Sequence, residues 1–184
     1  MAKSRKPPVK TPLLDSLDPD RARTVLLLLI RDDPGIADRA EAHARALLET
    51  VDYEQVAGLL FADLESLDIE DVWETAGQQR DGSYRYPGER AYEMAEEILA
   101  PYRDELSACM ERGMPEAALD CAKGLILGLW RFRTESSASI LPELEDSIPD
   151  LISDICSSVE EGIGDPGRAV LLREWMEEEG IPVL

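Results

Sequence analysis

The sequence predicts an all-α protein of seven or eight helices arranged in antiparallel hairpins. Three observations support this fold class. Aspartate followed by proline precedes an apolar run at Asp18-Pro19, Asp33-Pro34 and Asp165-Pro166, where the aspartate can cap a helix and the proline suits its first position. Apolar residues then recur at helical spacing. No segment stands out with the apolar–polar alternation of a half-buried strand.

The N-terminal part begins with a basic segment. Residues 1–12 contain four basic residues and three prolines, a composition that cannot form a core, so we expect a disordered tail. The rest of the chain, 13–184, is expected to form a single domain. The run VLLLLI at 25–30 is bounded by charges on both sides, which predicts a largely buried helix over 19–31. A second helix is predicted from Pro34 to about Val51.

Two further helices are predicted before a central loop. The first, over 53–67, places five apolar residues on one face: Val56, Leu59, Leu60, Leu64 and Leu67. The second starts from an Asp68 cap and turns Ile69, Val72 and Trp73 inward, and Gly77 ends it. The segment 78–90, QQRDGSYRYPGER, contains two turn signals and is predicted to be a loop.

A helical hairpin is predicted around Gly113. A long apolar pattern runs from Glu89 to Arg112, and Pro101 within it should kink or break the helix. Gly113 can adopt the left-handed conformation that ends a helix, and Pro115 suits the first turn of the next. Because the connection is short, the two helices should pack antiparallel.

The returning helix carries small residues at helical spacing. They are Ala118, Cys121 and Ala122 on one side and Gly124 and Gly128 on a second stripe. Each glycine costs roughly 1 kcal/mol against alanine inside a helix, so we expect a neighbouring helix to approach closely there. Farther on, an apolar stripe over 148–159 predicts a helix ended by Gly162 or Gly164, and a last helix follows from Pro166.

The charge composition limits the choice of partners. The 184 residues include 39 acidic and 19 basic side chains, a formal charge of -20. Such a field repels phosphate backbones and anionic membrane surfaces, so we expect the body of the domain to bind neither nucleic acid nor membrane. It favours cations or a basic protein segment as the partner.

Sequence motifs for chemistry are missing. Cys109, Cys121 and Cys156 are dispersed and form no CxxC pair, and the only histidine is His43. This set predicts buried thiols in a reducing, cytoplasmic setting and no metal site. The sequence has neither GxxxxGK[ST] nor GxGxxG, so it offers no phosphate loop. We therefore predict no catalytic residues, no cofactor and no enzymatic activity.

The candidate binding residues lie in the central loop and at the end of the hairpin. Tyrosine and arginine are enriched at binding hot spots, and loops often carry function. In the alternative interpretation, a tyrosine packs into the core and the arginines pair with nearby acids. We expect one tyrosine anchored under the loop and the other exposed. The candidates are Tyr84, Arg85, Tyr86 and Arg90, with Arg131 and Arg133 as a second, weaker basic group.

The hairpin also resembles known helical repeats. Gly113 followed five residues on by Ala118 resembles the turn of a tetratricopeptide unit, a family that carries small residues where its paired helices cross. The order of VDYEQVAGLL, APYRDEL and GMPEAALDCAKGLILGL over residues 20–160 resembles the helical region beside SWIM-type zinc fingers in some bacterial and archaeal proteins. This resemblance implies a tetratricopeptide-like bundle or short superhelix of unassigned activity. The zinc finger itself is absent, since the sequence has no CxC or CxH pair.

The sequence thus favours a non-catalytic helical scaffold that binds a protein segment. A rival interpretation is a small regulatory or DNA-associated protein, which would act through the basic tail or as an acidic mimic of nucleic acid.

Overall fold

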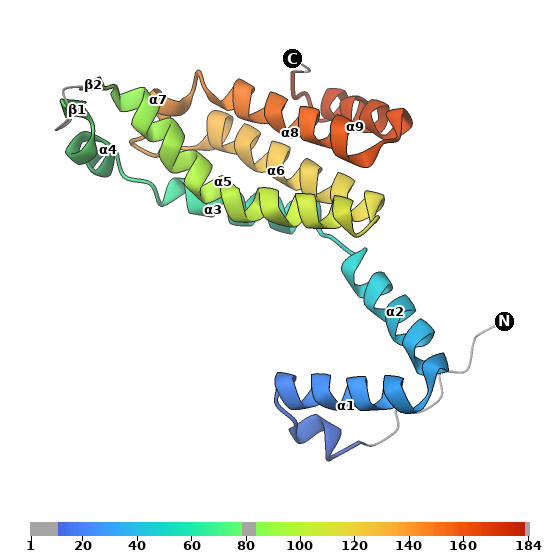
Figure 1. Ribbon diagram of the computed structural model, residues 1–184. Helices are drawn as coiled ribbons and strands as arrows, with labels where there is room; N and C mark the ends of the chain where they lie inside the picture. Colours follow the sequence, from blue (N-terminus) through green and yellow to red (C-terminus); the bar gives the residue numbers. More distant parts are fainter. Residues whose placement is uncertain (1–10, 79–83, 183–184) are drawn as a thin grey trace. The chain divides into compact units, whose positions relative to one another are not determined.

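The computed structural model describes residues 11–78 and 84–182, and within these residues it is helical apart from one pair of two-residue strands (Figure 1). The all-α prediction is confirmed. The described residues form nine α-helices, and the helix beyond the predicted seven or eight is the four-residue α7, in a segment for which the sequence analysis names no element. The elements are η1 (Leu14–Ser16), α1 (Pro19–Asp32), α2 (Pro34–Leu48), α3 (Tyr53–Glu65), α4 (Ile69–Thr75), β1 (Gly77–Gln78), β2 (Tyr84–Arg85), α5 (Pro87–Glu111), α6 (Pro115–Glu135), α7 (Leu141–Leu144), α8 (Ile148–Ile163) and α9 (Pro166–Glu178).

The predicted aspartate caps are present at all three helix starts. The Arg21 backbone N–H donates to the Asp18 carboxylate over 2.8 Å. The carboxylates of Asp33 and Asp165 each accept a hydrogen bond from the backbone N–H two residues on, of Gly35 over 2.9 Å and of Gly167 over 3.0 Å. These bonds satisfy backbone donors that have no partner inside the helix.

The chain divides into two compact units, residues 1–47 and residues 48–184, where the sequence predicts a single domain over 13–184. Of the predicted tail, residues 1–10 lie outside the described residues. The first unit contains η1, α1 and most of α2. Among its described residues, 11–47, none is buried. The prediction that α1 is largely buried is therefore wrong: Leu26, Leu27, Leu28 and Leu29 are 42–55% exposed. Among residues 11–47, only η1 and α2 lie beside α1, and neither buries these leucines.

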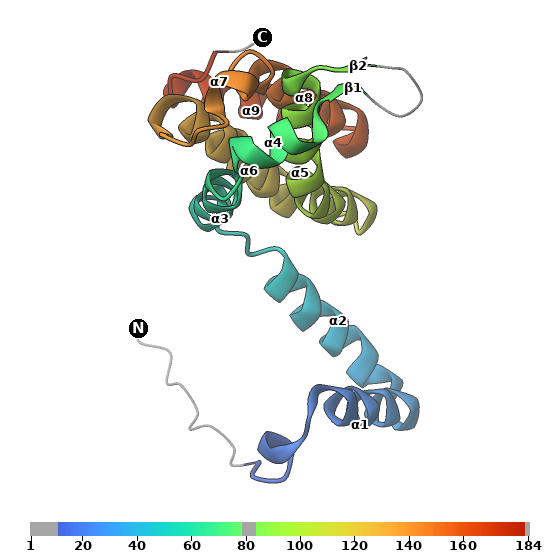
Figure 2. The ribbon, with the colours of Figure 1, turned by 90° about the vertical axis from the view of Figure 1, so that its left-hand side faces the viewer.

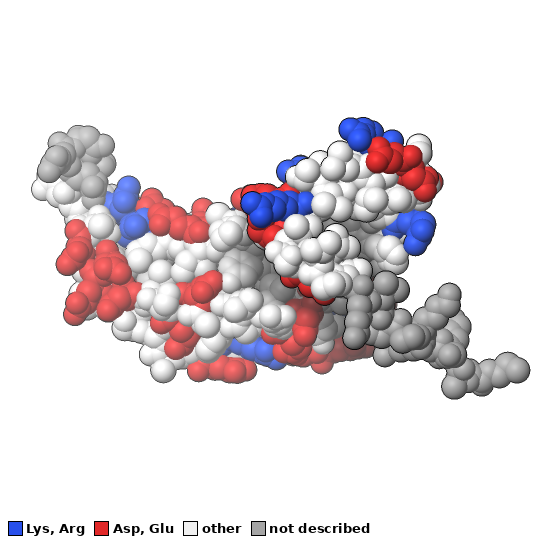
Figure 3. Space-filling view, turned by 90° about the horizontal axis from the view of Figure 1, so that it is seen from below, with Lys and Arg blue, Asp and Glu red and all other residues white. Residues whose placement is uncertain are grey.

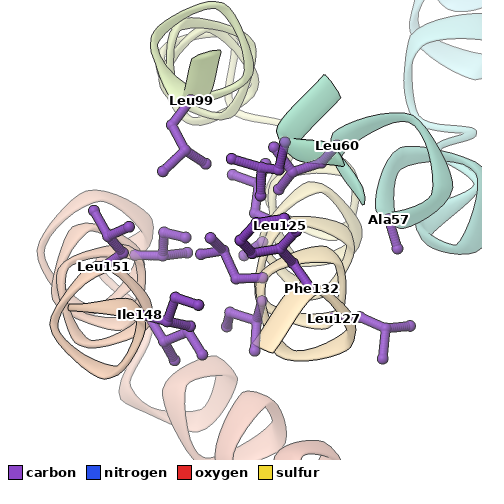
Figure 4. Packing of buried hydrophobic residues seen from close by; sticks show 14 of the residues in the cluster. Ala57, Leu60, Leu99, Leu125, Leu127, Phe132, Ile148 and Leu151 are labelled. Atoms are coloured by element: carbon purple, nitrogen blue, oxygen red, sulfur yellow. The ribbon is translucent and has the colours of Figure 1, made fainter. Parts of the chain in front are cut away.

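The second unit is built around α6. This helix packs against α3, α5, α8 and α9, and twelve of its twenty-one residues are buried. Side chains from the surrounding helices meet it in one apolar cluster (Figure 4). Figure 2 shows α3, α5 and α8 on different sides of α6. The labelled members of the cluster are Ala57, Leu60, Leu99, Leu125, Leu127, Phe132, Ile148 and Leu151.

Two glycines let α3 approach α6 closely, as the sequence predicts. A Cβ atom on Gly124 would lie 2.6 Å from the Val56 Cβ and 2.9 Å from the Tyr53 carbonyl oxygen. A Cβ on Gly128 would lie 3.0 Å from the Ala57 carbonyl oxygen. The helix propensity lost at each glycine is offset by this contact.

The predicted hairpin of α5 and α6 is also present. Helix α5 begins at Pro87 and continues through Pro101, so the proline does not break it, and the helix changes direction part-way along (Figure 1). Gly113 has a φ of +66°. The Met114 N–H donates to the Cys109 carbonyl and the Gly113 N–H to the Met110 carbonyl, both over 3.0 Å. This is the bonding pattern that ends a helix when a left-handed residue follows its C-cap.

Replacing Gly113 by valine should lower the free energy of unfolding by about 1 kcal/mol or more, because a β-branched residue is strained at positive φ. Chemical denaturation followed by circular dichroism would measure the change. Asparagine, which tolerates this conformation better, is the control and should cost less. Equal stability of the valine variant and the wild type would contradict the assignment of this turn.

Two other predicted core positions differ from the structure. Leu59 and Trp73 are exposed, at 53% and 62%, although we expected both to face inward. Ile69 and Val72 do face inward and are enough to attach the short helix α4 to α5. Helix α8 ends at Gly164, whose φ is +65°, and not at Gly162.

Candidate protein-binding surface

The candidate surface is formed by α4, the strand pair and the first turns of α5, which lie together at one end of the second unit (Figure 1). Strand β1 pairs antiparallel with β2, with Gly77 opposite Arg85 and Gln78 opposite Tyr84. The predicted loop at 78–90 thus contains the second residue of β1, all of β2 and the start of α5. Its residues 79–83 lie outside the described residues. We call this region, formed by α4, the β1–β2 hairpin and the first turns of α5, the hairpin end.

Three aromatic side chains are exposed at the hairpin end. Tyr84 is 58% exposed and Tyr86 62%. Their ring centroids lie 5.1 Å apart in an edge-to-face arrangement. Trp73 on α4, also 62% exposed, is a third aromatic that our sequence interpretation had placed in the core. The predicted split between a buried and an exposed tyrosine is wrong. In extended backbone, residues two apart point to the same side, so Tyr84 and Tyr86 contact each other.

The arginines of the hairpin end are paired with carboxylates of α5. Arg85 Nη1 lies 3.4 Å from Glu93 Oε2. Arg90 Nη1 lies 3.2 Å from Glu93 Oε2 and 3.1 Å from Glu97 Oε1, and its Nε donates to Thr75 Oγ1 over 3.1 Å. The hydrogen bond to Glu97 raises the pKa of Arg90. The two arginines therefore tie the hairpin and α4 to α5.

The second basic group lies on α6 and is also paired. Arg131 Nη1 lies 2.8 Å from Glu54 Oε2 at the start of α3. The Arg133 guanidinium lies 5.8 Å from the centre of the Trp130 ring, within the range of a cation–π contact. These contacts hold Arg131 against α3 and Arg133 against its own helix α6, away from the strand pair.

The surroundings of the hairpin end are acidic. Figure 3 shows acidic side chains gathered at this end of the second unit, with a small basic group beside them. A groove of about 560 Å³ runs along α5 and is lined by Glu93, Glu96, Glu97, Ala100, Arg103 and Asp104. A second groove, of about 450 Å³, is lined by Gly88, Glu89, Tyr92, Glu93, Ser147 and Asp150. Glu93 belongs to both grooves, which therefore adjoin the arginines of the hairpin end.

The three cysteine thiols are weak nucleophiles in their surroundings. Cys109 and Cys121 are buried, as predicted, whereas Cys156, also predicted to be buried, is only half-buried. Burial raises the pKa of the Cys121 thiol to about 12. Burial also raises the pKa values of Cys109 and Cys156. Thiols with raised pKa values are weak nucleophiles at neutral pH. Within residues 11–78 and 84–182, no three His, Cys, Asp or Glu side chains are grouped so that they could hold a metal ion.

Replacing both Tyr84 and Tyr86 by alanine should change the free energy of unfolding by less than about 1 kcal/mol, because exposed side chains contribute little to the core. A thermal melt followed by circular dichroism would show it. A loss of about 3 kcal/mol or more, the cost of truncating a buried aromatic, would contradict the exposed placement.

None of the described helices is long and apolar enough to cross a membrane. Comparisons of the chain with protein-family models, with curated proteins and with solved structures find no match.

Proposed function

We propose that this protein is a non-catalytic helical scaffold that binds a basic, extended protein segment at the hairpin end. The observation that carries the proposal is the exposed pair Tyr84 and Tyr86 beside two acidic grooves, with a further exposed aromatic, Trp73, on the neighbouring helix α4. Tyrosine and tryptophan are the residue types that most often dominate the energy of protein interfaces.

The chemistry of this end suits arginine and lysine side chains. Aromatic faces attract such cations by about 0.5–1 kcal/mol at exposed sites. The carboxylates that line the grooves along α5 add long-range attraction, since residues 48–184 carry thirty-two acidic and ten basic side chains. The acids speed the encounter and the aromatics supply short-range contact. The resemblance to a tetratricopeptide-like region also supports a scaffold role.

The same charge supports a second candidate function, that of an acidic mimic of nucleic acid. A mimic would bind the nucleic-acid site of another protein through charge spread over many helices. It would not depend on two tyrosines. Substitution of the aromatics therefore separates the two candidates.

The test is a fluorescence-anisotropy titration with arginine- and lysine-rich peptides about ten residues long. We expect binding that weakens with added salt and that weakens about tenfold or more in the double variant Tyr84→Ala, Tyr86→Ala. The matched control is Leu59→Ala with Leu171→Ala, which truncates two exposed side chains on α3 and α9. This control should bind like the wild type.

Binding that is equally strong in the wild type and the tyrosine variant would contradict the proposed site and favour the mimic. Salt-sensitive binding of DNA that disappears on deletion of residues 1–12 would instead favour a DNA-associated role for the basic tail.

A further inference from the structure

Two arginines of the hairpin end share one carboxylate oxygen. Glu93 Oε2 lies 3.4 Å from Arg85 Nη1 and 3.2 Å from Arg90 Nη1. Glu93 also lines both grooves of this end, those of about 560 and 450 Å³. A guanidinium group on this carboxylate therefore lies where the two grooves adjoin.

The two arginines are held to different degrees. Arg90 has only 19% of its side chain exposed, and it also contacts Glu97 and Thr75, each over 3.1 Å. The Arg85 side chain is 38% exposed, and Glu93 is the only acid paired with it in the part of the chain that the structure describes. Arg90 is thus a fixed part of the packing between α4 and α5, whereas Arg85 is attached by a single exposed ion pair.

Release of Arg85 from Glu93 requires little rearrangement. Exposed ion pairs contribute little to stability, because water screens the charges and both side chains lose freedom when they pair. Successive residues of a strand point to opposite sides, so Arg85 can leave Glu93 while Tyr84 and Tyr86 keep their contact. Arg85 lies between these tyrosines in the sequence. An extended segment of ten residues, about 33 Å long, can therefore reach both the rings and Glu93.

We propose that Arg85 is a built-in competitor at the peptide site, and that Glu93 is the carboxylate that accepts an arginine of the bound segment in its place. This inference rests on the proposed function and specifies the chemistry of the partner. A guanidinium group already occupies Glu93, so the protein itself presents the group that this carboxylate takes. Guanidinium is planar and more weakly hydrated than the ammonium group of lysine, so the segment should carry arginine at this position.

Fluorescence anisotropy with an arginine-rich peptide tests the proposal in a double-variant cycle of the full chain. Arg85→Gln should bind the peptide at least about threefold more tightly, because the competitor is removed, and Glu93→Gln should bind it at least about threefold more weakly. In the Glu93→Gln background, the further change Arg85→Gln should give a clearly smaller gain, since only the general effect of the lost positive charge remains.

The matched control is Arg112→Gln. Arg112 Nη1 lies 3.3 Å from Glu105 Oε1 in another exposed pair on α5, and neither residue lines the two grooves. This variant loses the same charge and should bind like the wild type. A second measurement needs no variant. During titration of the labelled wild type, the nuclear magnetic resonance signal of the Arg85 side-chain Nε–H should shift, and that of Arg90 should stay.

Unchanged or weaker binding by Arg85→Gln would overturn the proposal. An equal gain in Arg112→Gln, or in the Glu93→Gln background, would overturn it too, because the gain would then reflect charge alone. Peptide binding that leaves the Arg85 signal unshifted would also overturn it. Each of these results leaves the proposed function standing. Absence of binding by the wild type and by every variant would instead contradict the proposed function itself, and this inference with it.

Discussion

Replacement of Phe132 by alanine is expected to lower the free energy of unfolding of the second unit by about 3–5 kcal/mol. Phe132 is fully buried on α6 (Figure 4). Its ring packs edge to face against that of Phe61, with 6.5 Å between the ring centroids. Alanine would remove this ring from the centre of the apolar cluster and leave a cavity. Urea denaturation followed by circular dichroism would measure the loss.

The matched control for Phe132 is an aromatic residue on the surface. Trp73→Ala removes an even larger side chain, but from a position that is 62% exposed, and it should cost less than about 1 kcal/mol. If the two variants lowered the free energy of unfolding by similar amounts, the placement of α6 at the centre of the core would be contradicted.

The second large effect is expected from Gly124→Ala. The added methyl group would lie 2.6 Å from the Val56 Cβ and 2.9 Å from the Tyr53 carbonyl oxygen, so α3 would have to move away from α6. Overpacking of this kind costs about 1–3 kcal/mol. The loss should outweigh the helix propensity gained with alanine, which is about 1 kcal/mol.

The opposite result is expected for a glycine on the facing helix. Gly58 lies in α3, and among the described residues no atom beyond its immediate backbone surroundings would lie within 4 Å of a Cβ placed there. Gly58→Ala should therefore stabilise the protein by up to about 1 kcal/mol. Destabilisation by both variants, or stabilisation by both, would contradict the close packing of α3 on α6.

Local signals in the sequence were sufficient to predict most helix boundaries. Asp18 and Asp165 with their following prolines, and Gly113 at the hairpin turn, act through bonds within a few residues of themselves. Gly124 and Gly128 also indicated a close helix–helix contact. Two glycines four residues apart lower the stability of a helix unless a neighbouring helix packs closely against them.

Burial was harder to predict, because it depends on which elements lie nearby. The run at 25–30 has the composition of a buried helix, yet the two-helix unit that contains it cannot enclose it. Trp73 has a helical spacing from Ile69 that suits the core, but the short helix α4 buries only the side with Ile69 and Val72.

The candidate surface could have been predicted more fully. Tyr84 and Tyr86 are separated by a single residue, and in extended backbone this spacing alone places both rings on one side and Arg85 on the other. The pairing of Arg85 and Arg90 with Glu93 was considered only as an alternative, since it depends on how the hairpin folds onto α5.

The most direct test of the proposed scaffold function is to locate a bound basic peptide by nuclear magnetic resonance. Backbone amide shifts of the labelled protein would be followed during titration with the arginine- and lysine-rich peptide. The account predicts that the largest changes cluster at the hairpin end, in Ile69–Thr75, at Tyr84 and Tyr86, and around Glu93 on α5, with α9 unaffected. Changes spread evenly over the acidic helices, or confined to α9, would contradict it.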